Sequence, residues 1–273
     1  MNGMPVQGAE NTIFKNTDLN GTPGMRRRIR CSAVHALLIV LLSAIAVPSA
    51  ILAETGRGYL DFGGGGKTGD FGTPTTSSLF TLSPTIGYVA PGFDVSATVP
   101  YLTLTSKTAG QSRTESGMGD VILRGGAMLI PEGPGGFSLN GTLALKLPTA
   151  DETRGLGTGE TDYGAFLGLY QRIGGVKLSL TGGYIKVGDP AGIDYNDITL
   201  YGVGISKLFG GTNIAASLEG RRAMVPGARN PQEANVGFFH VLNADYSVRG
   251  SAFKGLNNGG PDVGMDFGIV RWF

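Results

Sequence analysis

Cysteine and histidine are nearly absent from this chain of 273 residues. Its one cysteine, Cys31, lies in the N-terminal part, and of its two histidines only His240 follows residue 53. The chain after residue 53 therefore has no disulfide, no thiol nucleophile and no cysteine metal ligand. The thiol and imidazole chemistry of many catalytic sites is thus nearly absent before any motif is considered.

After residue 53 the sequence also lacks an apolar run of about 20 residues, the length that a membrane-spanning helix needs. Glycine, in contrast, is abundant, and 43 of the 47 glycines follow residue 53. Glycine weakens helices and suits strands that bend, bulge and twist. These two features together predict an all-β protein.

A secretory signal peptide is expected at residues 25–53. Four arginines between Arg26 and Arg30 precede an apolar run from Ala33 to Ala53 that ends in small residues, the pattern of an export signal. We expect cleavage after Ala53, with Ala46 and Ala50 as alternatives. Pro48 interrupts the run, which favours a cleaved signal over a membrane anchor. Residues 1–24 precede a second methionine and are interpreted as a mis-set start or a disordered extension.

The remaining chain carries little net charge. Without Lys15, the four arginines, Glu10 and Asp18, residues 54–273 hold 17 basic and 19 acidic side chains, a formal net charge of −2. No basic surface for nucleic acid is expected from this balance.

Alternation of apolar and polar residues recurs along residues 54–273. In the stretch "FSLNGTLALKL" (137–147) the odd positions are apolar or glycine and the even ones mostly polar, which is typical of a strand with two different faces. Alternation and turn residues predict twelve strands, at 57–66, 78–89, 92–104, 117–130, 136–147, 161–172, 175–187, 196–208, 212–224, 234–243, 246–256 and 262–273. Most of these approach the roughly 9–11 residues that a tilted strand needs to cross a bilayer.

The connections between these strands alternate strictly in length. Short joints at 90–92, 131–135, 173–175, 210–212 and 243–245 are separated by longer polar ones, at 67–77, 105–116, 148–160, 188–196, 225–234 and 257–262. This order is typical of outer-membrane barrels, and a soluble Greek-key sandwich gives no reason for it. We predict that residues 54–273 form a single antiparallel up-and-down transmembrane β-barrel of twelve strands, with both termini periplasmic.

The chain ends on an aromatic residue. In "GMDFGIVRWF", Met265, Phe267, Ile269 and Phe273 share one parity. A terminal aromatic on an amphipathic strand is the signal that outer-membrane assembly machinery reads, so Phe273 is the expected assembly signal.

Two stretches resemble a known family. "SGMGDVILRGGAML" (116–129) is similar to its Gly-x-Gly-Asp strand opening, and "LKLPTADETRGLGTGETDYGAFLGLY" (145–170) to its strand–Pro–Thr–loop–Gly–Asp–strand unit. The family is that of the outer-membrane β-barrels of the phenol meta-pathway of degradation, regarded as transporters. The resemblance covers roughly residues 55–273 and implies a barrel that passes small compounds, with aromatic ones as candidates.

Two glycine-rich motifs do not predict a nucleotide site. "DFGGGGKT" (61–68) ends like a phosphate loop, but Asp61 replaces its first glycine and no helical pattern follows. "GLGTG" (155–159) has no βαβ context.

An outer-membrane lipid hydrolase is the enzymatic alternative, with a serine and a histidine as its central pair. His240 is the one candidate base, and Asn243 and Ser247 follow it closely. Positions 240 and 243 face opposite ways on one strand, so no local triad is expected. No metal or cofactor site is predicted either.

The alternation places six charged side chains inside the barrel, namely Asp120, Arg124, Lys146, Lys177, Glu219 and Arg221. Charges of both signs can filter ions in a pore, or pair and fill a non-conducting barrel. Both possibilities stay open. We predict an outer-membrane channel for passive diffusion of small solutes, without a cofactor. Its expected partners are lipid, lipopolysaccharide and the barrel assembly machinery.

Overall fold

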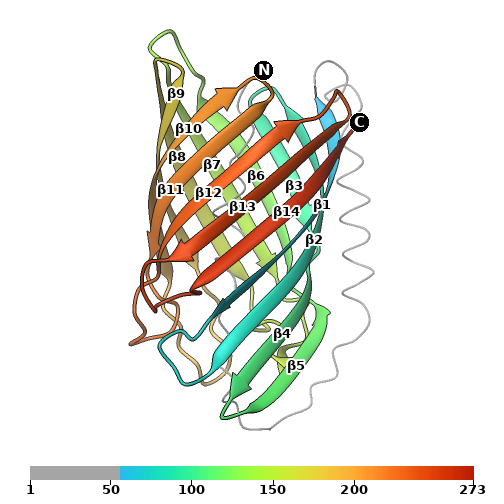
Figure 1. Cartoon of the computed structure of the whole chain (residues 1–273), viewed down its shortest axis with the longest axis vertical. Helices are drawn as coiled ribbons and strands as arrows, with labels where there is room; N and C mark the ends of the chain where they lie inside the picture. The colour runs from blue at the N-terminus through green and yellow to red at the C-terminus, as the bar shows by residue number, and fades with distance from the viewer. Residues whose placement is uncertain (1–55) are drawn as a thin grey trace.

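Alternating strands fold into a closed antiparallel ring in the computed structural model, which describes residues 56–273 (Figure 1). The ring closes because β1 pairs with both β2 and β14. The expected signal peptide and the segment 1–24 lie outside the described residues. The strands are β1 (Arg57–Gly69), β2 (Thr76–Ala90), β3 (Phe93–Thr98), β4 (Tyr101–Thr108), β5 (Gln111–Met118), β6 (Val121–Ile130), β7 (Phe137–Leu147), β8 (Asp162–Ile173), β9 (Val176–Lys186), β10 (Ile198–Phe209), β11 (Thr212–Arg221), β12 (Gln232–Val241), β13 (Tyr246–Gly255) and β14 (Val263–Trp272).

The barrel wall has the predicted twelve strands, because two of them are interrupted. Strands β3 and β4 both pair with β2 and are separated only by Val99 and Pro100. Proline has no N–H to donate to the ladder, so the strand breaks there. Strands β5 and β6 are likewise separated only by Gly119 and Asp120. The prediction of a twelve-stranded antiparallel barrel is confirmed.

The prediction that residues 105–116 form a loop is wrong, because these residues form a β-hairpin. Strand β4 continues to Thr108 and turns back through Ala109 and Gly110, whose φ angles are 49° and 82°. Two consecutive left-handed residues are the geometry of a tight hairpin turn. The hairpin projects beyond the rest of the barrel (Figure 1), and β5 pairs with β4 alone.

The two ends of the barrel differ. At one end, here called the turn end, short connections join the strands, at 91–92, 131–136, 174–175, 210–211 and 242–245. The C-terminus lies there, and the Phe273 N–H donates to the Gly58 carbonyl at 2.9 Å. The opposite end, here called the loop end, carries the β4–β5 hairpin and the longer connections 70–75, 148–161, 187–197, 222–231 and 256–262.

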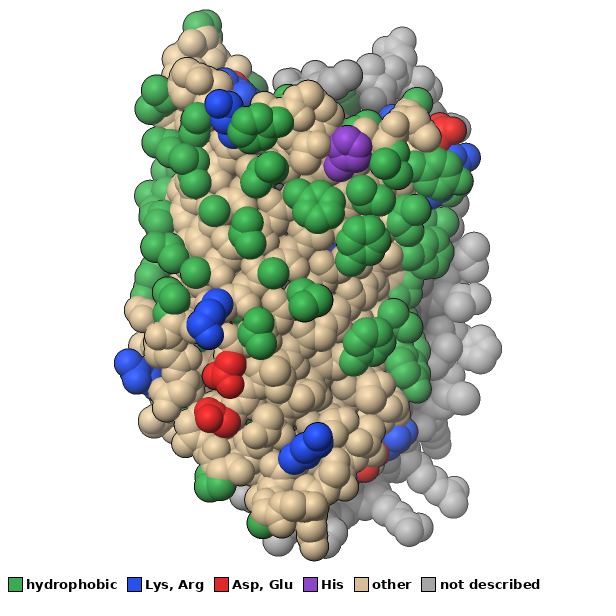
Figure 2. Space-filling model, in the orientation of Figure 1, with side chains coloured by type: hydrophobic (Ala, Val, Ile, Leu, Met, Phe, Trp, Pro, Cys, Tyr) green, Lys and Arg blue, Asp and Glu red, His purple; other side chains and the backbone are tan. Residues whose placement is uncertain are grey.

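Apolar side chains cover the outer surface between two aromatic girdles. Figure 2 shows this apolar surface on the face formed by the C-terminal strands. Leu143, for example, is 68% exposed on β7. Exposed tyrosines lie toward the loop end, at Tyr101, Tyr163, Tyr184 and Tyr201, and exposed aromatics lie at the turn end, at Phe93, Phe137, Phe209, Tyr246 and Phe273. An apolar band between aromatic girdles is the surface that a barrel presents to a bilayer. Within residues 56–273, no helix is long and apolar enough to cross a membrane.

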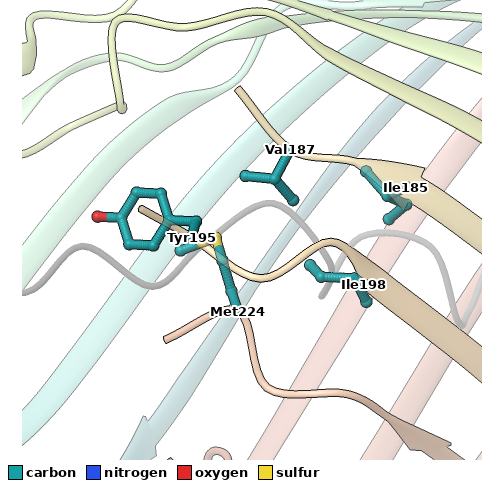
Figure 3. Close-up of a cluster of buried hydrophobic side chains, with 5 residues drawn as sticks. All are labelled: Ile185, Val187, Tyr195, Ile198 and Met224. Atoms are coloured by element: carbon teal, nitrogen blue, oxygen red, sulfur yellow. The ribbon is translucent and has the colours of Figure 1, made fainter. Parts of the chain in front are cut away.

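Two apolar clusters are buried. Tyr59, Val270 and Trp272 pack at the turn end, where β1 meets β14, with the rings of Tyr59 and Trp272 5.3 Å apart. The second cluster lies at the loop end (Figure 3) and contains Ile185, Val187, Tyr195, Ile198 and Met224. It joins β9 and β10 to the connections 187–197 and 222–231.

Candidate functional site

A large cavity lies inside the barrel along the wall formed by β6–β11. Its volume is about 1220 Å³, and it extends from the turn end to Arg221 and Glu233 near the loop end. Many of the residues that line it are small, including Gly126, Gly141, Gly168, Gly182, Gly220, Thr142, Ser179, Thr181 and Ser217. Space remains here because this wall contributes little side-chain volume.

The lining combines apolar and charged groups. Phe166 and Leu200 line the cavity and also pack against the apolar cluster of Figure 3, so that cluster lies next to the cavity toward the loop end. The charged lining residues are Arg57, Asp94, Glu219, Arg221 and Glu233. Such a mixed wall suits solutes that have an apolar body and a few polar groups.

The opposite wall is filled by an ionic network around Arg249. Its guanidinium donates to Asp61 at 2.7 Å and also to Asp266, which accepts a further hydrogen bond from Ser251. A β-carbon at Gly268 would lie 2.8 Å from Asp61 Oδ1 and 3.0 Å from Arg249 Cζ. Glycine is therefore required where the network lies against the backbone of β14.

A second network surrounds Lys146, which is 1% exposed. Its ammonium lies 2.8 Å from Asp162 and 3.5 Å from Asp120, and it donates to the Thr158 hydroxyl at 2.9 Å. Asp120 accepts the Ala150 N–H. Asp162 accepts the N–H of Gly188. The cluster thus connects the barrel wall to the connections 148–161 and 187–197.

The connection 148–161 folds against the barrel interior. It contains the short helix η2 (Glu152–Arg154), which is capped by Asp151. Leu156 is buried and, with Asp120 and Arg249, lines a smaller cavity of about 110 Å³. Arg154 donates to Glu115 at 2.9 Å. This loop therefore occupies part of the loop end of the barrel.

The six predicted lumen charges fall into different surroundings. Asp120 and Lys146 belong to the buried network, whereas Glu219 and Arg221 line the large cavity. The Arg221 guanidinium donates to Glu233 at 3.0 Å, and Glu219 accepts from Ser217 at 2.7 Å. That these charges act in a conducting lumen stays a prediction.

The other two lie apart from these four. Lys177 is near the turn end, where its ammonium lies 3.7 Å from Glu132 and 5.1 Å from the centre of the Tyr170 ring. Arg124 is half-buried on β6 and has the parity of Ile122 and Met128, which line the small and the large cavity. The predicted set is therefore not one cluster.

Sequence reasoning missed the whole Arg249 network, which contains Asp61, Arg249 and Asp266. It also missed Asp162 in the Lys146 network and Glu233, the partner of Arg221. Asp61, Asp162 and Asp266 each lie next to an exposed apolar or aromatic residue in the same way as the predicted charges. Asp266, for instance, lies between the exposed Met265 and Phe267. In β1, β12, β13 and β14, the odd or even position of each residue along the strand shows that its side chain faces inward. This signal would have identified most of them.

The glycine-rich stretch and the candidate His240–Ser247 pair have no arrangement typical of a nucleotide or catalytic site. Gly66, Lys67 and Thr68 continue β1, so this glycine-rich stretch is a strand. His240 contacts the Thr212 hydroxyl at 2.7 Å and has the parity of the exposed Val236 and Phe238. Ser247 is buried on the neighbouring strand, opposite Val241, and accepts from Trp272. His240 and Ser247 do not form a pair. Within residues 56–273, no three His, Cys, Asp or Glu side chains are grouped to hold a metal ion.

Two carboxyl groups outside the strands are held in their charged form. The hydrogen bond from Arg172 lowers the pKa of Glu132 in the connection 131–136. The hydrogen bond from the Tyr184 hydroxyl lowers the pKa of Asp197 in the connection 187–197. Both ends of the barrel thus carry anchored charges at the boundary of the apolar band.

The fold is shared with solved outer-membrane proteins. An outer membrane channel from Pseudomonas putida superposes with a TM-score of 0.66 over 81% of this chain and 96% of that chain, at 14% identity. The translocator domain of the autotransporter NalP from Neisseria meningitidis gives a TM-score of 0.51 over 89% and 98% of the two chains, at 14% identity. The KdgM porin gives 0.50 over 79% and 99%, at 11% identity. At these identities the likeness concerns the fold.

A search of curated proteins finds no match. A family model does match, over residues 58–218, which include both stretches that carry the resemblance noted in the sequence. The match covers more than half of the chain. The chain belongs to the family described as "Putative MetA-pathway of phenol degradation".

Proposed function

We propose that this protein is an outer-membrane channel for passive diffusion of small solutes, with aromatic and other apolar compounds as candidates. The observation that carries the proposal is the cavity of about 1220 Å³ inside a closed barrel. The apolar outer surface and its two aromatic girdles place that cavity across a bilayer. The structurally similar channel from Pseudomonas putida supports the same function by analogy.

The lining of the cavity supports the solute class. Phe166, Leu200 and Trp272 provide apolar surface, whereas Thr142 and Ser179 provide hydroxyl groups. Neither a catalytic step nor a cofactor is part of this proposal. The alternative of a lipid hydrolase has no support from the placement of His240 and Ser247, which lie on different faces of the wall.

The proposal also includes how the protein is exported and how the barrel is oriented in the outer membrane. Export by the signal at residues 25–53 would leave the turn end, with both termini, in the periplasm and the loop end facing outward, beside lipopolysaccharide. Sequencing the N-terminus of the mature protein tests the cleavage after Ala53. Proteolysis of whole cells tests the orientation, because only the loop end should then be cleaved.

Single-channel recording in a planar bilayer tests the function. The wild-type barrel should give discrete conductance steps, and Thr142→Trp should lower them because Thr142 lines the cavity. Leu143→Trp is the matched control, since Leu143 is the neighbouring residue on the outer face. We expect the control to conduct like the wild type.

Liposome swelling then compares solutes. Benzoate should enter wild-type proteoliposomes faster than Thr142→Trp ones, and an aliphatic carboxylate of similar mass gives the baseline. A folded wild-type barrel that gave no conductance and no swelling would refute the channel and leave the non-conducting structural barrel.

A further inference from the structure

Two oxygen acceptors that have no hydrogen-bond donor among residues 56–273 face the large cavity from strands on either side of β6. Asp94 on β3 and Asn140 on β7 both line the cavity. Among residues 56–273, Asp94 has neither a hydrogen bond nor an ion pair. Within the same residues, the buried Asn140 Oδ1 atom has no partner. An unpaired acceptor in such a place is unfavourable until a donor reaches it.

Strand β6 lies between the two acceptors. Asp94 is opposite Gly126, Gly126 is opposite Thr142, and Asn140 is the next inward residue of β7. A β-carbon at Gly126 would lie 3.0 Å from Asp94 Cγ and 3.2 Å from Asp94 Oδ2. The carboxylate therefore lies across the face of Gly126, in the direction of β7, where the Thr142 hydroxyl also lines the cavity.

Within residues 56–273, the basic side chains of the cavity wall make no ion pair with Asp94. Arg221 is paired with Glu233 at 3.0 Å, and Arg57 donates to the Ala244 carbonyl at the turn end. A carboxylate, a carboxamide oxygen and a hydroxyl on one wall are complementary to a cation with several N–H donors. The nearby Met128 provides apolar surface for a hydrocarbon body.

We propose that Asp94 and Asn140 form a subsite that binds the ammonium group of small organic amines in the channel. This inference rests on the proposed channel function and specifies one class of its solutes. Asp94 provides the charge, Asn140 accepts a second hydrogen bond, and Gly126 leaves the space between them. The same carboxylate gives the cavity a preference for cations over anions.

Block of the channel current tests the subsite. 2-Phenylethylammonium should block the wild-type K⁺ current at lower concentration than 3-phenylpropionate, an anion of similar size. Asp94→Asn should weaken block by the amine by about tenfold, the scale of one charge-assisted hydrogen bond, and should shift the reversal potential in a KCl gradient toward zero. Asn140→Leu should weaken block by the amine and leave the reversal potential unchanged.

Asp194→Asn is the matched control, because Asp194 is an exposed carboxylate in the connection 187–197. It should behave like the wild type in both measurements. Equal block by amine and anion in a conducting channel, or an equal effect of Asp194→Asn, would overturn the subsite and leave the channel function intact.

Calorimetric titration of the folded barrel in detergent with 2-phenylethylammonium separates the two proposals further. Binding that Asp94→Asn weakens would support the subsite even in a barrel that does not conduct. A wild-type barrel that binds the amine no more tightly than Asp94→Asn does would refute it.

Discussion

At the scale of single residues, the barrel interior depends on buried ion pairs. Arg249 lies between Asp61 and Asp266, and the side chain of Asp61 is 2% exposed. Removing one partner of a buried ion pair leaves an uncompensated charge, which typically costs about 3–5 kcal/mol. Arg249→Met should lower the free energy of unfolding by about that amount. Urea titration, followed by the gel shift between folded and boiled protein, measures it.

Arg271→Met is the control for Arg249. Arg271 pairs with Asp245 at 3.2 Å, but both side chains are well exposed. Exposed pairs contribute about 0–1 kcal/mol, so this variant should unfold near the wild-type urea concentration. Equal losses in the two variants would contradict the assignment of a structural network around Arg249.

Glycine at position 268 is a second requirement of that network. A β-carbon there would meet Asp61 and Arg249, whereas one at Gly66 would find only a backbone oxygen, 3.8 Å away. Gly268→Ala should therefore reduce the fraction of folded barrel, as seen on the same gels, and Gly66→Ala should not. A stable Gly268→Ala barrel would show that the network can move away from β14 without loss.

At the scale of elements, the connections of the loop end are held by side chains of the wall. Lys146 joins Asp120, Asp162 and Thr158, so it anchors the connection 148–161. Lys146→Met would leave two buried carboxylates together. We expect faster proteolysis in residues 148–161, a stability loss of about 3–5 kcal/mol, and larger, noisier current steps. Replacing Lys146 by an acidic residue would also disrupt this network, so a change in ion preference in such a variant could not be assigned to the charge alone.

Lys186→Met is the control for this anchor. Lys186 is 60% exposed and pairs with Asp197, on the same end of the barrel. Its loss should change stability by only about 0–1 kcal/mol and leave proteolysis unchanged. If Lys146→Met were cleaved no faster than this control, the connection 148–161 would be held by other contacts.

The β4–β5 hairpin provides a pH-dependent contact with the same connection. Hydrogen bonds from Arg154 and then Arg113 lower the pKa of Glu115, which lies on the hairpin beyond the barrel. A carboxyl with a lowered pKa in the fold stabilises it fully above its unfolded pKa, about 4.3 for glutamate. The contribution is lost as the pH falls through the lower, folded value.

Hydrogen exchange measures this effect. Amides near Arg154 should exchange faster, relative to their intrinsic rates, when the pH falls below about 4. Glu115→Gln should be equally unprotected at all pH values, because it has no charge to lose. A wild-type protection that does not change with pH would argue against a role of this ion pair in holding the loop.

At the scale of the whole molecule, the sequence predicted the wall and missed what lies beyond it. Alternation follows directly from one face toward lipid and one toward the lumen, so twelve strands could be read from it. In "TSKTAGQSRTES" (105–116) neither face is apolar, because the hairpin projects beyond the apolar band. Alternation therefore disappears although the strands continue.

The candidate site was predictable only in part. Parity identifies an inward residue such as Lys146 or Glu219. It does not say which inward charges meet, because Asp61 and Arg249 are 188 positions apart in the chain. That pairing depends on closure of the ring and on the register of β1, β14 and β13. The cavity depends in turn on which wall carries glycine and small polar residues.

Closure of the ring leads to the last prediction, on Phe273 as the assembly signal. Its side chain is 65% exposed, and its N–H makes one hydrogen bond to Gly58 across the seam. Removing Phe273 should cost the folded barrel about 0.5–1.5 kcal/mol, the net value of one such bond, and refolding in detergent should proceed nearly as before. The amount of protein in the outer membrane should fall severalfold, because the assembly machinery no longer recognises the last strand.

Phe209→Ala is the control, because Phe209 is an exposed aromatic residue at the same end of the barrel. This variant should reach wild-type levels in the outer membrane. Normal membrane levels of the truncated chain would mean that recognition depends on other residues of β14.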